Sequence, residues 1–174
     1  MAVVEETRAQ VHERAGPPWT AVLHEWVTTV DHKKIGILYV IMAVVFLVIG
    51  GVEALLLRWQ LIRPRYDFIG PDAFNQLFTM HGTTMVFFMG MPMLIGFGNY
   101  LVPLMIGARD MAFPRLNAFG FWVTLLGGVL VHFSFATGGA PAIGWFAYAP
   151  LTERTFARSA ATDFWCLGLM VSGA

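Results

Sequence analysis

The sequence has few charged side chains and almost no cysteine. Only 13% of its 174 residues are charged and 57% are hydrophobic, whereas a soluble domain normally has about 25% charged residues. The single cysteine, Cys166, excludes a disulfide framework, a zinc site made of thiolates alone and an iron–sulfur cluster within this chain. Lys and Arg balance Asp and Glu at 11 each and form no extended basic block, so no nucleic-acid partner is expected.

Long apolar segments account for this composition. Together they contain one charged side chain, Glu53; the segments are residues 35–57, 77–107 and 116–152. A helix needs roughly 20 apolar residues to cross a bilayer, because lipid cannot satisfy exposed backbone groups. The sequence therefore predicts an all-α, polytopic transmembrane helix bundle. The predicted spans are about 35–58, 77–107 and 116–139.

The two ends of the chain differ from these spans. Residues 1–34 are polar and contain no apolar stretch with a cleavage site, so a cytoplasmic N-terminal segment is expected in place of a secretory signal. The basic cluster at residues 32–34 favours an N-terminus inside the cell. After a Gly/Pro/Trp-rich surface loop at 138–150, residues 162–174 begin a fourth span that stops at about half length. The chain is therefore expected to be a piece of a longer one.

Polar side chains inside a span are costly unless they face a partner, a cofactor or water. His81, near the start of the second span, suits either a metal ligand that holds haem iron in a bundle or a hydrogen bond to a neighbouring helix. Arg58 ends the first span, either as a cation that reaches the membrane surface or as an inward hydrogen-bond donor. Glu53 is interpreted either as a buried acid or as a partner of Arg58 at the edge of the span, and both interpretations stay open.

A second polar group surrounds the turn between the second and third spans. Asn99 follows His81 by 18 residues, or five turns of about 3.6 residues, so the two are predicted to share a helix face. Asp110 and Asn117 flank the turn. A surface carboxylate beside inward amides suits a proton entrance, because the acid collects protons and ordered water passes them on. The alternatives are a solvated or helix-capping Asp110 and an Asn99 that simply joins two helices.

Several other side chains have structural interpretations. His132 in the third span is predicted to be a core histidine, and the methionines between residues 80 and 105 to be packing residues. Trp145 and Tyr148 fit the aromatic belt at a membrane surface.

Three motifs are more specific than these patterns. They are DHKKIG at residues 31–36, FTMHGT at 78–83 and NYLVPLMIGARDMAFPRLN at 99–117. With these motifs the chain resembles, over roughly residues 28–174, subunit I of the haem–copper terminal oxidases of the cytochrome c oxidase type. Their order and spacing make coincidence implausible.

The resemblance implies roles for four residues around a low-spin haem A. His81 matches one of the two axial ligands of its iron, the second being on a later helix. Arg58 matches the arginine that hydrogen-bonds the haem formyl group and raises the haem potential. Trp145 and Tyr148 match the loop over the haem propionates. The family's copper histidines, cross-linked tyrosine and high-spin haem ligand lie beyond residue 174, so this piece alone is not expected to be active.

The resemblance also implies a proton path and a function. Asp110 matches the entrance of the family's aspartate channel, and Asn99 and Asn117 match the asparagines that order water inside it. The implied protein is the roughly twelve-span catalytic subunit of a proton-pumping bacterial plasma-membrane oxidase. It would act with subunits II and III in the lipid bilayer and pass electrons from cytochrome c to oxygen. A quinol oxidase of the same family, a haem-free ion-coupled transporter and a structural or assembly fragment stay as alternatives, whereas the channel disfavours a nitric oxide reductase.

Overall fold

A computed structural model describes residues 17–157 and 159–173 of the chain. This part is helical and contains no strand. Its elements are α2 (Trp19–Thr28), α3 (His32–Gln60), α4 (Pro71–Thr83), the π-helix η1 (Thr84–Gly90), α5 (Met91–Met105), α6 (Pro114–Phe133), the 3-10 helix η2 (Ser134–Thr137) and α7 (Ala161–Gly173). The first 16 residues of the expected cytoplasmic segment lie outside the described residues.

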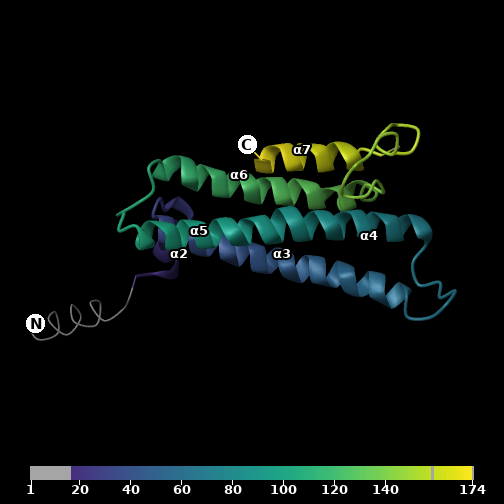
Figure 1. The fold of residues 1–174 in the computed structure, drawn as a ribbon, viewed down its shortest axis with the longest axis horizontal. Coiled ribbons are helices and arrows are strands. Elements are labelled where there is room, and N and C mark those ends of the chain that lie inside the picture. The colour runs from purple at the N-terminus through teal and green to yellow at the C-terminus, as the bar shows by residue number, and fades with distance from the viewer. Residues whose placement is uncertain (1–16, 158, 174) are drawn as a thin grey trace, which may run out of the picture.

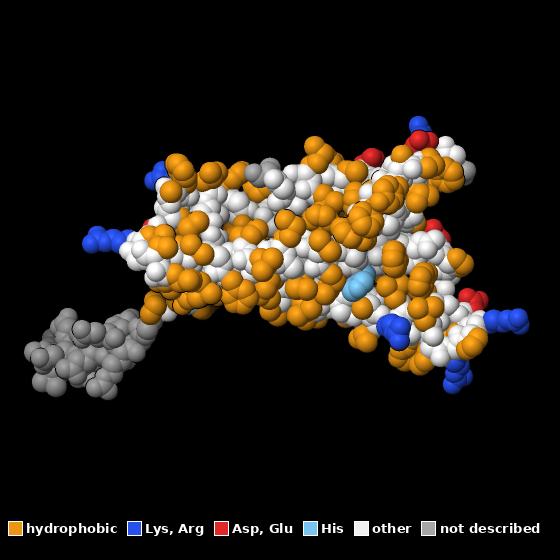
Figure 2. Space-filling model, in the orientation of Figure 1, with side chains coloured by type: hydrophobic (Ala, Val, Ile, Leu, Met, Phe, Trp, Pro, Cys, Tyr) orange, Lys and Arg blue, Asp and Glu red, His pale blue; other side chains and the backbone are white. Residues whose placement is uncertain are grey.

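Long helices run side by side along one axis (Figure 1). Three of them have the length and composition of membrane spans: α3 with 29 residues, the continuous helix from α4 through η1 to α5 with 35, and α6 with η2 with 24. Large apolar side chains cover the middle of the face in Figure 2, and charged side chains gather toward its two ends. A soluble protein rarely exposes so much contiguous apolar surface. The prediction of an all-α membrane bundle is confirmed.

Local sequence sets the helix boundaries. The Asp31 side chain caps α3 by accepting the Lys33 backbone N–H at 2.9 Å. Proline occupies the first position of α4 and of α6, where its missing N–H costs no helical hydrogen bond. Gly107 turns the chain after α5 with a φ of 70°, which glycine adopts readily. The bundle therefore has an Asp110 end, at the α5–α6 turn, and an Arg58 end, where α3 finishes.

The second span is interrupted by the π-helix η1, which the sequence analysis did not anticipate. Pro92 lies two residues after its last residue, Gly90. Proline cannot donate a hydrogen bond and its ring clashes with the carbonyl four residues earlier, so a wider turn before it relieves the conflict. The Met91 N–H accordingly bonds to the Val86 carbonyl, five residues back.

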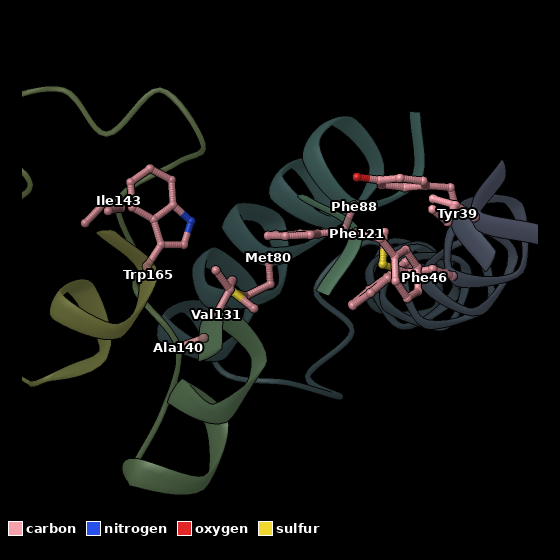
Figure 3. Packing of buried hydrophobic residues seen from close by; sticks show 11 residues of the cluster. Tyr39, Phe46, Met80, Phe88, Phe121, Val131, Ala140, Ile143 and Trp165 are labelled. Atoms are coloured by element: carbon pink, nitrogen blue, oxygen red, sulfur yellow. The ribbon is translucent and has the colours of Figure 1, made fainter. Parts of the chain in front are cut away.

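The helices pack through glycines and aromatic rings. A Cβ on Gly36 of α3 would lie 2.9 Å from the Gly96 carbonyl oxygen of α5, so only small residues allow this approach. In the core, Tyr39 meets Phe121 edge to face at 5.1 Å, and Phe46 lies 5.3 Å from Phe88 (Figure 3). α3 therefore packs against both long neighbours.

The remaining helices lie at the margins of this packing. α7 packs on α6, and its Trp165 side chain donates to the Thr83 hydroxyl at 2.9 Å. α2 has no buried residue, and Lys34 of α3 contacts it through an ion pair with Glu25.

Candidate functional site

His81 is held in one orientation by the neighbouring helix. Its Nδ1 lies 2.9 Å from the Gly50 carbonyl oxygen of α3. A carbonyl only accepts, so Nδ1 is the nitrogen that bears the proton, and the neutral ring has its free lone pair on Nε2. No described residue makes a hydrogen bond to Nε2, and the side chain is half-buried. This is the orientation in which a histidine binds a metal through Nε2 while its other nitrogen is fixed by a backbone carbonyl.

An open strip on α3 lies next to this ring. Gly51 follows Gly50, whose carbonyl oxygen accepts the hydrogen bond from His81, and a Cβ on Gly51 would meet no atom within 4 Å. Arg58 comes seven residues after Gly51, close to two full turns, so it lies on the same face about 10 Å further along the helix. Its side chain is exposed and makes no hydrogen bond or ion pair within the described part of the chain.

The aromatic loop after η2 covers the start of the second span. The Trp145 ring lies against Gly82, where an added Cβ would approach Cδ1 to 2.9 Å. Trp145 stacks on Phe146 at 4.2 Å, and Phe146 stacks on Tyr148 at 5.5 Å. Trp145 is half-buried whereas Tyr148 is 67% exposed. The structure therefore places Trp145 beside the residue after His81 and leaves Tyr148 at the outside of the stack.

Hydrogen bonds from α4 fix this loop. The Gly144 N–H donates to the Thr79 hydroxyl at 2.9 Å, and the Ala140 N–H donates to the Gln76 side chain at 3.0 Å. The loop position is therefore set by the same helix that presents His81. Neither Gln76 nor Thr79 is marked as functional by the sequence, because a polar residue near the start of a helix is ordinarily solvated.

At the other end of the bundle the two predicted asparagines meet. Asn99 Nδ2 donates to Asn117 Oδ1 at 3.0 Å, which joins α5 to α6. Asn117 Nδ2 is buried without a partner among the described residues. The fully buried His32 donates from Nδ1 to the Asn99 carbonyl oxygen at 2.8 Å. This role of His32 was not predicted; the only sign of it in the sequence is an ionisable residue directly before a span.

Asp110 stands apart from these amides. It is exposed, its Oδ1 accepts the Met111 backbone N–H at 2.7 Å, and no hydrogen bond joins it to Asn99 or Asn117 in the described part of the chain. The alternative of a helix cap is wrong, because α6 has Phe113 at its N-cap position and no side-chain cap. The carboxylate therefore faces the surface at the turn.

The expected shared face of His81 and Asn99 is also wrong. The expectation needs 3.6 residues per turn throughout, and the π-helix η1 between the two residues breaks that period. The His81 ring accordingly bonds to α3, whereas the Asn99 side chain bonds to α6. The two polar groups are separate features of the bundle.

Glu53 is a buried acid. Its side chain is 5% exposed, and its Oε2 has no partner among the described residues. Near it in the bundle, the Thr84 hydroxyl of η1 lies 3.1 Å from His132 Nε2 of α6. His132 also packs on Phe46 with a ring separation of 5.3 Å, consistent with the predicted core histidine.

Comparison with known proteins identifies relatives for most of the chain. The family described as Cytochrome C and Quinol oxidase polypeptide I matches residues 34–174. Cytochrome c oxidase subunit 1 of Bacillus sp. (strain PS3) is 50% identical over 153 residues, which are 88% of this chain and 25% of that protein. Quinol oxidase subunit 1 of Bacillus subtilis (strain 168) is 46% identical over 155 residues, which are 89% of this chain and 24% of that protein. The chain spans about a quarter of the length of these relatives.

Proposed function

The chain belongs to the cytochrome c and quinol oxidase polypeptide I family, and from this membership we propose that it is the N-terminal part of the catalytic subunit of a proton-pumping haem–copper oxidase. The whole subunit passes electrons from cytochrome c to oxygen, which is reduced to water. It lies in a bacterial plasma membrane with its N-terminus in the cytoplasm and assembles with subunits II and III. This piece contributes one ligand of the low-spin haem and the beginning of the proton path.

The orientation of His81 is the observation that supports this proposal most. Its Nδ1 is used by the Gly50 carbonyl, its Nε2 is left for iron, and the open strip at Gly51 leaves room for a flat ring beside α3. These residues fit a haem, held by His81 on one side of the iron. When bound, a haem A accepts and passes on single electrons.

The other residues at the Arg58 end act on the surroundings of that haem. Arg58, on the same face as Gly51, supplies a guanidinium donor for a polar substituent of the ring and stabilises negative charge there. The Trp145 loop, fixed to α4 through Thr79 and Gln76, excludes water from the space next to Gly82. Low polarity and few waters strengthen every charge interaction inside the site.

The Asp110 end handles protons. The exposed Asp110 carboxylate collects them from water at the membrane surface. The buried Nδ2 of Asn117 lacks a partner in the described chain, so it is a donor ready to hold a water molecule inside the bundle. The Asn99–Asn117 pair thereby orders the first part of a water path between α5 and α6.

A quinol as electron donor is the second candidate. Relatives named cytochrome c oxidase and relatives named quinol oxidase match this chain at similar identity, 46–50%. A quinol oxidase of this family would share the haem ligand and the proton path, so the residues above do not distinguish the two donors.

Two measurements on the full-length subunit in its assembled complex test the proposal. A pyridine haemochrome spectrum is expected to report bound haem A, and the absence of haem would instead favour an ion-coupled transporter. Oxygen consumption with reduced cytochrome c is expected to exceed consumption with a quinol. The reverse order would assign the protein to the quinol oxidases.

A further inference from the structure

The short helix α2 carries its large apolar side chains along one side. They recur at the three- and four-residue spacing of a single helix face, and they are Trp19, Val22, Leu23, Trp26 and Val27. The other side carries polar residues and one alanine, which are Thr20, Ala21, His24, Glu25 and Thr28. α2 is therefore amphipathic, although none of its residues is buried in the described part of the chain.

The apolar side of α2 lacks the contacts that a short helix needs. α2 has 10 residues and no side-chain cap at its start, and an isolated helix of that length is marginal in water unless its apolar face is packed. Trp19 is 76% exposed, Leu23 56% and Val27 46%. These three side chains, four residues apart, form an exposed line that nothing among the described residues covers.

Two contacts with Lys34 of α3 fix how α2 is rotated. The Lys34 ammonium forms an ion pair with Glu25 and lies 5.9 Å from the centre of the Trp26 ring. Glu25 and Trp26 are neighbours on one flank of α2, roughly 100° apart around the axis. The exposed line therefore points away from Lys34, and α2 is attached to the bundle by its flank alone.

α2 lies at the depth where the first span enters the bilayer. Residues 29–31 join it to α3, and each residue extends a chain by at most about 3.6 Å. The apolar run of α3 begins at Ile35, three residues after the helix starts. Val30 in this connection lines one hollow with Phe113 and Leu116, next to the α5–α6 turn. The position of α2 is therefore limited to the membrane surface at the Asp110 end.

The direction of α2 favours lipid over protein as its cover. α2 runs across the direction of the long helices (Figure 1), so it lies in the plane of a bilayer that those helices span. A further span, parallel to them, would meet a crosswise helix over only part of its length, whereas the bilayer surface covers all of it. Helices that lie in a membrane surface carry Trp and Leu on one face and polar residues on the other, and Trp is enriched at this depth.

From this placement we propose that α2 is a membrane-surface helix at the Asp110 end of the bundle. Its exposed line inserts between the lipid headgroups toward the acyl chains, and its polar side faces water. Bilayer lipid is thus the partner of this surface. The inference goes beyond the proposed oxidase function and does not depend on a haem at His81.

Fluorescence quenching of the full-length oxidase in phosphatidylcholine nanodiscs tests this orientation. Reactive native cysteines are replaced, including the exposed Cys166, and Leu23→Cys or the matched control His24→Cys is labelled with bimane. The label at position 23 is expected to show blue-shifted emission and quenching by a phosphatidylcholine that carries a nitroxide high on its acyl chain. The label at position 24 is expected to be quenched by iodide in the water instead.

The other outcomes overturn the inference. Equal quenching of both labels by iodide would place α2 in water, and equal quenching of both by the lipid nitroxide would place the whole helix inside the bilayer. A label at position 23 that neither quencher reaches would show that protein covers the exposed line. If labelled Leu23→Cys fails to assemble, Trp19→Cys and Ala21→Cys give the same comparison between the two sides of α2.

Discussion

The buried polar side chains at the Asp110 end bond to one another, whereas His81 and Arg58 at the other end have no side-chain partners among the described residues. His32, Asn99 and Asn117 form a chain of hydrogen bonds within the described residues. At the other end, His81 has a nitrogen without a partner and Arg58 has a guanidinium without an ion pair in the same part of the chain. The Arg58 end therefore has polar groups available for a further ligand, whereas most polar groups at the Asp110 end are already used, so the two ends should respond to different substitutions.

The largest effect is expected at the open end. His81→Ala in the full-length subunit should remove the low-spin haem, because no other described side chain takes the place of Nε2 beside the Gly51 strip. The reduced-minus-oxidised absorbance spectrum measures this loss. His24→Ala, on the exposed helix α2, is the matched control and should leave the spectrum intact. An unchanged spectrum in His81→Ala would contradict a haem site at the Arg58 end.

The Asp110 end should lose proton movement without losing haem. Asp110→Asn removes the charge that collects protons but keeps the size of the side chain and an oxygen for Met111 N–H. Turnover should fall roughly tenfold or more, since a positioned proton-transfer group contributes at least that much, and pumping should be uncoupled or abolished. Oxygen consumption and proton ejection are measured together. Altered haem absorbance in this variant would contradict a role confined to proton uptake.

A packing variant sharpens the comparison at the Arg58 end. Gly82→Ala places a Cβ 2.9 Å from the Trp145 ring, whereas Gly98→Ala meets nothing within 4 Å. The first should destabilise the aromatic loop by about 1–3 kcal/mol, as overpacking does, and the second should change stability by less than about 1 kcal/mol. Thermal unfolding in detergent, followed by tryptophan fluorescence, measures both. Equal midpoints would show that Trp145 is not fixed against α4.

The smallest effect concerns the start of α3. Burial by itself raises the pKa of Asp31, but hydrogen bonds from Lys33 and the positive charges of Lys33 and His32 outweigh it and lower the pKa below its ordinary 3.8. The charged cap therefore contributes fully above about pH 4, and the contribution is lost as the pH falls through the lowered pKa. Hydrogen exchange of the Lys33 amide should become faster as the pH falls through the lowered pKa of Asp31, because the protonated cap holds this amide less tightly. Asp31→Asn, which still caps, should remove this pH dependence, and an identical profile in both proteins would contradict the assignment.

The sequence predicted the helical elements well and their register poorly. The spans follow from apolar runs and the absence of charge, because a bilayer leaves the backbone few alternatives. The π-helix before Pro92 could not be foreseen from an average helical period, and it invalidated the shared face of His81 and Asn99. The one feature of the sequence that could have indicated this π-helix is Pro92, a proline in the middle of a long span.

The residues of the candidate site could be singled out from the sequence, but their contacts could not. His81, Asn99 and Asn117 are predictable as site residues because lipid does not tolerate lone polar groups. In the structure His81 bonds to the Gly50 carbonyl, and Asn99 bonds to Asn117. The Thr84–His132 contact could not be predicted, since it joins residues 48 positions apart in two helices and depends on how those helices are rotated about their axes. Threonine is also common in membrane helices, where it bonds to its own backbone, so Thr84 gave no signal.

The orientation of His81 is the central claim, and an experimental map of the assembled oxidase tests it most directly. The account predicts a porphyrin beside the Gly51 face of α3, with its iron bound by Nε2 of His81 and with Nδ1 still donating to the Gly50 carbonyl. A ring turned toward the lipid, or a protein side chain filling the space beside Gly51, would contradict it.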